Sequence, residues 1–203
     1  MSPAARYRHS YRFGFLHHSH GVAMITVFVA VLSAISLAQA QGKSPLRVVP
    51  EVDMVRYAGQ WYEIARFPNR FQKRCAGEVT ADYTLQPSGK ISVLNRCRLE
   101  NGSQIEAKGV ARVVGKGQPN SVLKVRFAPA FLSFLPQVWG DYQIIALSPD
   151  YTHALVGDPS RDYLWILARS PRMDDAAYDR FVEEAQAQGF DAGRLVRTRQ
   201  DGS

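Results

Sequence analysis

The stretch AGQWYEIARFPNRFQKRC, residues 58–75, places aromatic side chains among charged ones. Trp61, Tyr62, Phe67 and Phe71 stand among one acidic and four basic residues. A buried core strand would not carry so much charge, and a solvated loop would not carry so much aromatic surface. We therefore expect a strand with one face toward an enclosed space and the other toward water.

Short segments of alternating apolar and polar residues follow this stretch. In EVTADYTL (78–85), Val79, Ala81 and Tyr83 fall on one face, and two threonines and an aspartate fall on the other. Period-two alternation bounded by Gly, Pro, Asn, Asp and Ser is typical of strands. The pattern predicts eight strands, over 59–67, 78–85, 90–97, 104–114, 121–127, 141–148, 152–157 and 162–169.

The fold class predicted from these strands is all-β. Most connections are short, which favours antiparallel neighbours. Eight such strands in sequence close into an up-and-down β-barrel, which removes exposed edges and leaves room for one small ligand. One helix is expected over 174–189, and its apolar face should pack outside the barrel. This face consists of Tyr178, Phe181, Val182 and Ala185. A short extra strand is expected over 194–198.

Residues 1–40 have the pattern of an export signal. Three arginines precede an apolar run over 21–38, and a small-x-small motif, Ala38-Gln39-Ala40, follows it. We expect cleavage there, which leaves one domain over 41–203; retention of the run as a membrane anchor is the alternative. No cysteine lies near this site, so an N-terminal lipid anchor is not expected. The expected location is the periplasm, the outer membrane or the medium.

Composition excludes several classes of protein. A hydrophobic content of 46% with 21% charged residues is that of a globular chain, not a disordered one. The net charge of +7 includes the three N-terminal arginines, and no dense basic cluster appears, so nucleic acid is not an expected partner. The mild excess could favour anionic membrane surfaces. No metal or cofactor is expected, because His17, His18 and His20 lie in the signal and only His153 remains.

The chain has two cysteines, Cys75 and Cys97. An even count in an exported chain suggests a disulfide, here closing a loop that contributes on the order of 3 kcal/mol. The rival interpretation is a free nucleophilic cysteine, which a single histidine and an oxidising compartment disfavour.

Three motifs resemble the signatures of the lipocalin family, in particular its bacterial Blc-type and apolipoprotein D-like members. They are Gly59-Gln60-Trp61-Tyr62, LSPDYTHALVGDP (147–159) and YLWILARSP (163–171). The resemblance covers about residues 53–198. It implies that Gly59, Trp61 and Arg169 are structural. The first strand climbs from the barrel floor and the eighth returns to it, so the Arg169 guanidinium should cover the Trp61 ring.

Alternation then assigns the residues that should line the barrel. With Trp61 and Arg169 at the floor, the interior should hold Ala65, Phe67, Val79, Ala81, Tyr83, Leu123, Val125, Phe127, Tyr142, Ile144, Trp165 and Leu167. These side chains could fill the barrel completely; the resemblance favours a cavity instead. An apolar, aromatic lining suits an acyl chain, because each buried methylene contributes about 0.8 kcal/mol.

The mouth of the barrel should carry charge and an apolar loop. The basic residues expected at the rim are Arg66, Arg70, Lys73, Arg74 and Arg161, which could pair with a carboxylate or phosphate or simply be solvated. Chain direction places both cysteines at this end. The segment 128–138 groups Phe131, Leu132, Phe134 and Leu135, and could contact a membrane, contact a second copy in a homodimer, or fold over the opening as a lid.

The resemblance implies a non-catalytic carrier of a fatty acid, a lysophospholipid or a similar lipid, active in membrane maintenance or stress. The alternative is an enzyme with the same fold that acts on a lipid or isoprenoid substrate. Glu63 could then serve as an acid or base if burial raised its pKa, although pairing with a nearby arginine is the simpler expectation. Haem is disfavoured because His153 should lie near the closed end.

Overall fold

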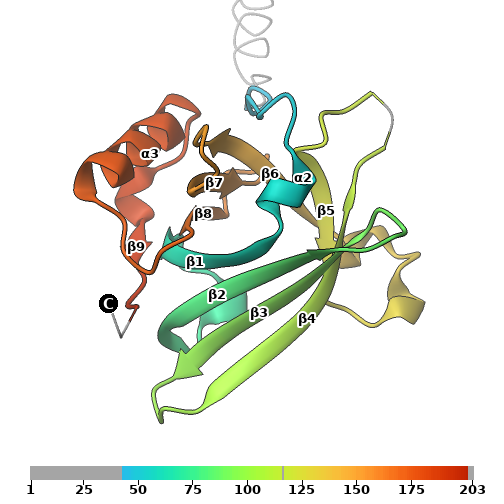
Figure 1. The fold of residues 1–203 in the computed structure, drawn as a ribbon, viewed down its shortest axis with the longest axis horizontal. Coiled ribbons are helices and arrows are strands. Elements are labelled where there is room, and N and C mark those ends of the chain that lie inside the picture. The colour runs from blue at the N-terminus through green and yellow to red at the C-terminus, as the bar shows by residue number, and fades with distance from the viewer. Residues whose placement is uncertain (1–42, 116, 201–203) are drawn as a thin grey trace, which may run out of the picture. The chain divides into compact units, whose positions relative to one another are not determined.

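The computed structural model describes residues 43–115 and 117–200, so the predicted signal over 1–40 lies outside the described residues. Nine strands form one antiparallel sheet (Figure 1). They are β1 (Gly59–Arg66), β2 (Cys75–Leu85), β3 (Ile91–Leu99), β4 (Gln104–Val113), β5 (Val122–Arg126), β6 (Gly140–Leu147), β7 (His153–Gly157), β8 (Leu164–Ala168) and β9 (Val196–Arg197). The helices are α2 (Met54–Tyr57) and α3 (Asp175–Ala187), with short 3₁₀ turns η1 (Arg70–Gln72), η2 (Ala130–Leu132), η3 (Pro136–Val138) and η4 (Ala192–Arg194).

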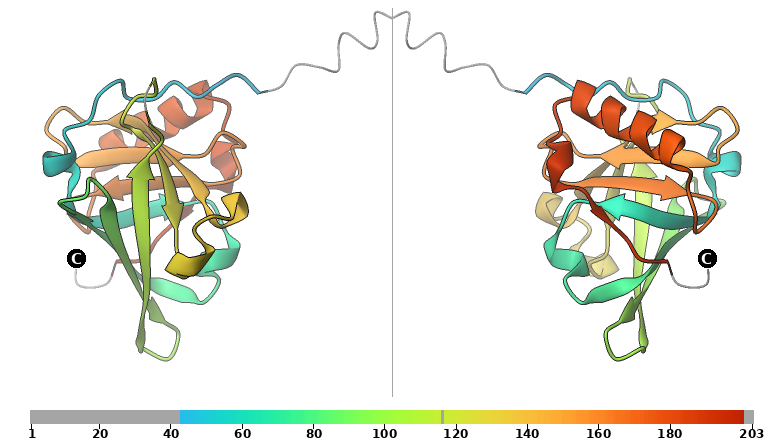
Figure 2. Two further views of the ribbon diagram at one scale, coloured as in Figure 1. Left: turned by 90° about the vertical axis from the view of Figure 1, so that its right-hand side faces the viewer. Right: turned by 90° about the vertical axis from the view of Figure 1, so that its left-hand side faces the viewer.

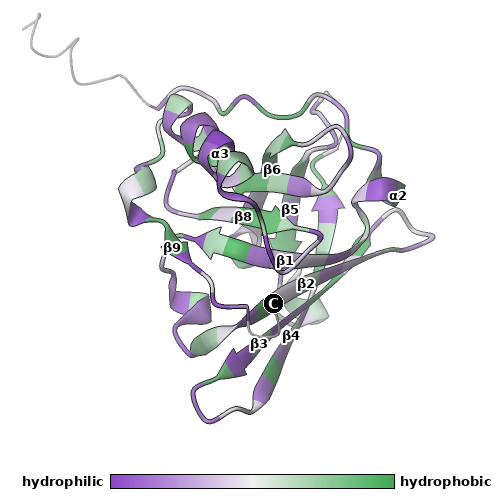
Figure 3. Ribbon diagram, turned by 60° about the vertical axis from the view of Figure 1, so that its left-hand side comes forward, coloured by the Kyte–Doolittle hydropathy of each residue, from purple (hydrophilic) through white to green (hydrophobic). Residues whose placement is uncertain are grey.

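The first eight strands close into a barrel. Each pairs with the next along the chain, β8 pairs with β1, and β1 pairs with β2 from Gly59↔Tyr83 to Tyr62↔Thr80. Hydrophobic and hydrophilic positions alternate along β3 and β4, as a strand with one face inside and one outside requires (Figure 3). The predicted up-and-down barrel of eight antiparallel strands is confirmed.

Helix α3 covers one outer face of the barrel (Figure 2). It begins at the N-cap Asp174, whose side chain accepts a hydrogen bond from the Ala177 amide. The predicted apolar face packs against strand residues Ile64, Ile166 and Leu155 and against Phe190. The barrel therefore has a second apolar layer between its wall and the helix, separate from the interior.

A β-bulge divides β1 into two halves that face differently. The pairing with β8 shifts between Glu63↔Leu167 and Ala65↔Ile166, so two residues of β1 lie opposite one of β8. Below the bulge, Trp61 belongs to the interior cluster. Above it, Ala65 and Phe67 lie in the layer under α3, so the prediction that these two line the interior is wrong. Simple alternation cannot anticipate the extra residue.

The floor of the barrel is built around Trp61 and Arg169. The Arg169 guanidinium carbon lies 3.9 Å from the Trp61 ring centroid, and its nitrogens donate to the carbonyl oxygens of Arg56, Tyr57, Ala58 and Gln60 at 2.6–3.0 Å. Gly59 has φ +92 and its missing Cβ would lie 3.4 Å from Arg169 Nη1, so both backbone and space favour glycine. These three predicted structural residues thus lie together, and Arg169 ties α2 to β1.

The chain's C-terminal segment lies between the upper parts of β1 and β2. There β9 pairs with β1 at Arg66↔Val196, the Thr198 amide donates to the Ile64 carbonyl (2.9 Å), and the Glu78 amide donates to the Arg199 carbonyl (2.7 Å). The predicted extra strand is present, and it completes the wall where β1 and β2 no longer pair.

Candidate ligand-binding site in the barrel

The lower interior is a continuous apolar cluster. Its buried members on the strands are Trp61, Tyr83, Ile91, Val93, Ala111, Leu123, Ile144, Ala154, Val156 and Leu167, and Val52 and Tyr57 close it from below. Ala81, Val125, Tyr142 and Trp165 pack against this cluster and are partly exposed. Eight of the predicted lining residues therefore lie in one place: Ala81, Tyr83, Leu123, Val125, Tyr142, Ile144, Trp165 and Leu167.

Three tyrosine hydroxyls meet inside this cluster. Tyr142 Oη lies 2.7 Å from Tyr57 Oη and 3.0 Å from Tyr83 Oη. Burial raises the pKa of Tyr83 to about 12 and raises the pKa of Tyr57 and Tyr142 well above the ordinary tyrosine value. The three groups are therefore uncharged at neutral pH, and they add a polar point to an otherwise apolar interior.

The inward face becomes accessible toward the mouth. Along β4, Ala111 is buried, Gly109 is half-buried and Ala107 is exposed, although alternation puts all three on the same face. Opposite Ala107 lies Asn95, whose Oδ1 is buried without a hydrogen-bond partner among the described residues. The barrel is closed below and open above, with an unpaired polar atom in its upper wall.

Glu63 shares the interior face of Trp61 by alternation, and the bulge that follows it turns Arg66 to the same face. Glu63 lies opposite Leu167 and Arg66 opposite Trp165, and both partners are interior residues. Arg66 Nε lies 3.7 Å from Glu63 Oε1, and the Arg66 side chain is only 15% exposed. Arg66 was expected at the rim, either paired with a carboxylate or phosphate or solvated; the structure places it in the wall instead.

Glu63 is held by hydrogen bonds from two other segments. Its carboxylate accepts from Gln72 Nε2 of η1 and from Thr198 Oγ1 of the C-terminal segment, both at 2.5 Å. Gln72 Oε1 accepts in turn from Trp165 Nε1 (3.2 Å). The predicted pairing of Glu63 with a nearby arginine agrees with its contact to Arg66, and the carboxylate links the mouth loop and the chain end to β1.

Burial raises the pKa of Glu63, against the smaller lowering effects of its two hydrogen bonds and of Arg66. The folded protein therefore binds this proton more tightly than the unfolded chain does. The resulting stabilisation is full at acid pH and declines as pH rises from about 4 through the folded pKa. The free energy of unfolding of Glu63→Gln, measured with urea between pH 4 and 8, should accordingly lack this decline. The exposed Glu100→Gln is the control, and curves for Glu63→Gln and the unaltered protein that stay parallel would contradict the assignment.

Two predicted lining residues lie at the margin of the site. Val79 packs with Cys97 and Leu99 in a small separate cluster at the mouth. Phe127 is 44% exposed, and its ring lies over Gly109, where an added Cβ would be 2.8 Å from it. The interior residues that sequence reasoning missed include Ile91, Val93 and Val156, although alternation in 90–97 and 152–157 already held the signal for them.

Aromatic rings extend from the interior to the mouth. Tyr163 stacks on Trp165 with ring centroids 5.9 Å apart, and Phe71 lies 5.9 Å from Tyr163 on the outer side. Phe71, Phe131 and Phe134 are 67%, 74% and 75% exposed. The basic residues Arg70, Lys73 and Arg74 are exposed beside Phe71, as expected for rim charges.

The predicted disulfide between Cys75 and Cys97 is confirmed, with the two Cα atoms 5.6 Å apart. Cys97 is buried against Val79 and Leu99. The bond fixes β2 to β3 where the pairing register is interrupted, between Cys75↔Leu99 and Gly77↔Arg98. Since these are the only two cysteines of the chain, no thiol is left for cysteine chemistry.

Comparison with known families agrees with this geometry. The model of a lipocalin-like domain matches residues 52–200. The chain belongs to the lipocalin family. Lipocalins bind small hydrophobic ligands.

Curated relatives share most of this lipocalin's length. Temperature-induced lipocalin-1 of Arabidopsis thaliana is 43% identical over 78% of this chain and 84% of its own. The outer membrane lipoprotein Blc of Escherichia coli K12 is 35% identical over 89% of this chain and 99% of its own. Among solved structures, insecticyanin from the tobacco hornworm Manduca sexta covers 77% of this chain and 85% of its own with a TM-score of 0.58 and 18% identity, a likeness of fold alone.

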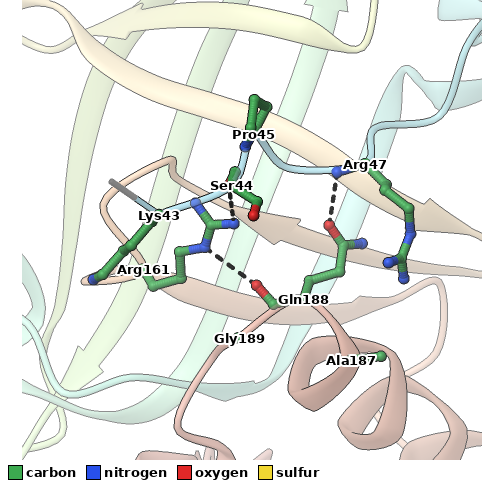
Figure 4. Close-up of a pocket in the computed structure, with 8 residues that line it drawn as sticks. All are labelled: Lys43, Ser44, Pro45, Arg47, Arg161, Ala187, Gln188 and Gly189. Carbon is green, nitrogen blue, oxygen red and sulfur yellow. Dashed lines mark hydrogen bonds between the residues drawn. The ribbon is translucent and has the colours of Figure 1, made fainter. Parts of the chain in front are cut away.

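Arg161 has a different place in this lipocalin from the one expected. It was expected at the rim, but it is 7% exposed. It donates to the carbonyl oxygens of Ser44 (2.5 Å) and Gln188 (3.2 Å) (Figure 4), and to that of Pro159 (2.7 Å). Arg161 thus connects the segment around Ser44, before α2, to the end of α3. A surface pocket of about 390 Å³ lies beside it. The expectation that Arg161 is a charge at the rim is wrong, because its guanidinium donates hydrogen bonds to three backbone carbonyls.

None of the helices within residues 43–115 and 117–200 of this lipocalin is long and apolar enough to span a membrane.

Proposed function

We propose that this lipocalin is a non-catalytic carrier that holds one lipid in its barrel, a fatty acid, a lysophospholipid or a similar molecule, and serves membrane maintenance. The observation that carries the proposal is the interior itself: apolar and closed at Trp61, partly exposed higher up at Val125 and Trp165. A long chain gains about 0.8 kcal/mol for each methylene that enters such a space. The proposed location is the cell envelope, as the name of the Blc relative suggests.

The test uses the protein exported into a bacterial periplasm. Native mass spectrometry with solvent extraction should find about one lipid per barrel, since barrels of this size hold one small ligand. Added lysophospholipid should then change the fluorescence of Trp165, which faces the interior. Trp165→Phe should remove that response. Trp139→Phe, a change at a ring that lies against the guanidinium groups of Arg112 and Arg126, should keep it. An empty protein whose fluorescence ignores lysophospholipid would refute the carrier.

The exposed phenylalanines support a further part of the proposal, contact of the mouth with a membrane. Phe131 and Phe134 project from the segment 128–138 at about three-quarters exposure, which favours an outward contact over a lid packed on the opening. The exposed rim cations Arg70, Lys73 and Arg74 suit an anionic surface. Phe131→Ser with Phe134→Ser should weaken sedimentation with phosphatidylglycerol vesicles, while Leu85→Ser, at an exposed position at the end of β2, should not. Equal sedimentation of all three proteins would count against membrane contact.

A further inference from the structure

Arg66 is a cation inside the wall of an otherwise apolar barrel. Because of the bulge, its cross-strand partner is Trp165, and its side chain is 15% exposed. Trp165 packs on the interior cluster. A guanidinium at this position lies above Trp61 along β1 and below the exposed residues of the mouth loop.

The hydrogen-bonding capacity of Arg66 is not used by its neighbours. Its Nε is buried without a hydrogen-bond partner among the described residues. The nearest carboxylate, Glu63, is 3.7 Å away, which is an ion pair without a hydrogen bond. That carboxylate already accepts from Gln72 and Thr198. Since a buried donor without an acceptor is costly, a ligand oxygen that bound this guanidinium would remove an unfavourable feature of the wall.

We propose that Arg66 binds the anionic head group of the carried lipid inside the barrel, with the acyl chain running down toward Leu123 and Ile144. This inference builds on the proposed carrier function and names its ligand class as a single-chain lipid with a carboxylate or phosphate. A planar guanidinium with several free donors matches either group. The ring of Trp165, directly across from Arg66, shields the pair from water on one side.

Glu63 weakens the binding of an anion at Arg66. Its carboxylate is a like charge for an arriving anion and shares Arg66 with it. Replacing it by glutamine removes the negative charge and keeps one oxygen that can accept from Gln72, while the new amide group can donate to the Thr198 hydroxyl. Glu63→Gln should therefore tighten binding of an anionic lipid without changing the binding of a neutral one.

The test compares cis-9-octadecenoate with cis-9-octadecen-1-ol, which share a chain and differ in charge. Dissociation constants are measured by calorimetry on the delipidated full-length protein. Arg66→Gln should weaken octadecenoate binding by about tenfold, the usual scale of a charge-assisted hydrogen bond, and leave the alcohol unchanged. The matched control is Arg180→Gln, an exposed arginine of α3 on the outside of the barrel, which should bind both probes as the unaltered protein does.

Each result of this comparison either supports the head-group site or overturns it. Equal weakening of acid and alcohol in Arg66→Gln, or no change in either, would overturn the head-group site while leaving the carrier proposal standing. Binding of neither probe by the unaltered protein would refute the carrier and this inference with it. If Arg66→Gln does not fold, Glu63→Gln decides: selective tightening of octadecenoate supports the site, and unchanged binding overturns it.

Discussion

Trp61→Ala should lower the free energy of unfolding by about 3–5 kcal/mol, the usual cost of truncating a large buried aromatic residue. Trp61 is fully buried at the barrel floor, and three interactions depend on it. Its ring centroid lies 3.9 Å from the Arg169 guanidinium carbon. Its Nε1 donates to the Tyr57 carbonyl (2.8 Å), and its ring packs on the Tyr57 ring with centroids 5.0 Å apart. Loss of the ring would also leave the Arg169 guanidinium without its aromatic contact.

Thermal unfolding followed by circular dichroism measures this effect, and the expected fall in Tm is about 10 °C for a domain of this size. Trp61→Phe should cost less, since a ring remains beneath Arg169. Phe131→Ala is the matched control, an aromatic truncation at a site that is 74% exposed. A Trp61→Ala protein as stable as Phe131→Ala would show that the floor is not the structural centre described above.

Removal of the Cys75–Cys97 disulfide should lower the free energy of unfolding by about 3 kcal/mol in the chain-entropy model. The sequence separation is 22 residues, and the bond also anchors the mouth cluster of Val79 and Leu99. The double variant Cys75→Ala, Cys97→Ala is preferred to serine, because Cys97 is buried and a hydroxyl there would lack a partner.

Urea unfolding of the oxidised protein, the reduced protein and the double alanine variant gives the comparison. The reduced protein and the variant should be destabilised by similar amounts, and reduction should have no effect on the variant. Unfolding midpoints that coincide with and without reductant in the unaltered protein would mean that β-pairing alone holds the mouth.

Sequence reasoning succeeded where each residue of a strand has one opposite partner. Along β5 and β6, alternation assigned Leu123, Val125, Tyr142 and Ile144 to the interior, where the structure has them. It failed at β1, because the bulge after Glu63 adds a residue and reverses every face beyond it. Nothing in GQWYEIAR announces that extra residue, since Ile64 and Ala65 are both apolar.

Arg161 shows a second limit of the sequence. An arginine in a loop of aspartate, proline and serine looks solvated, and its neighbours Pro159 and Asp162 give no other signal. Its acceptors Ser44 and Gln188 come from segments far away in the chain, so only the folded structure brings them together. Every residue has a backbone carbonyl, so the residue types in the sequence do not reveal which carbonyls accept from an arginine.

The pairing of Thr198 and Arg199 with β1 and β2 sets an order of events during folding. Thr198 and Arg199 bond to the backbones of Ile64 and Glu78, which were translated more than a hundred residues earlier. While the ribosome still holds this segment, the wall between β1 and β2 stays open at the mouth and Glu63 lacks one of its donors. Such distant pairings form late. The upper wall and the surroundings of Glu63 are therefore the last parts of the calyx to be completed, and the folding chain passes through a form whose barrel is still open on this side.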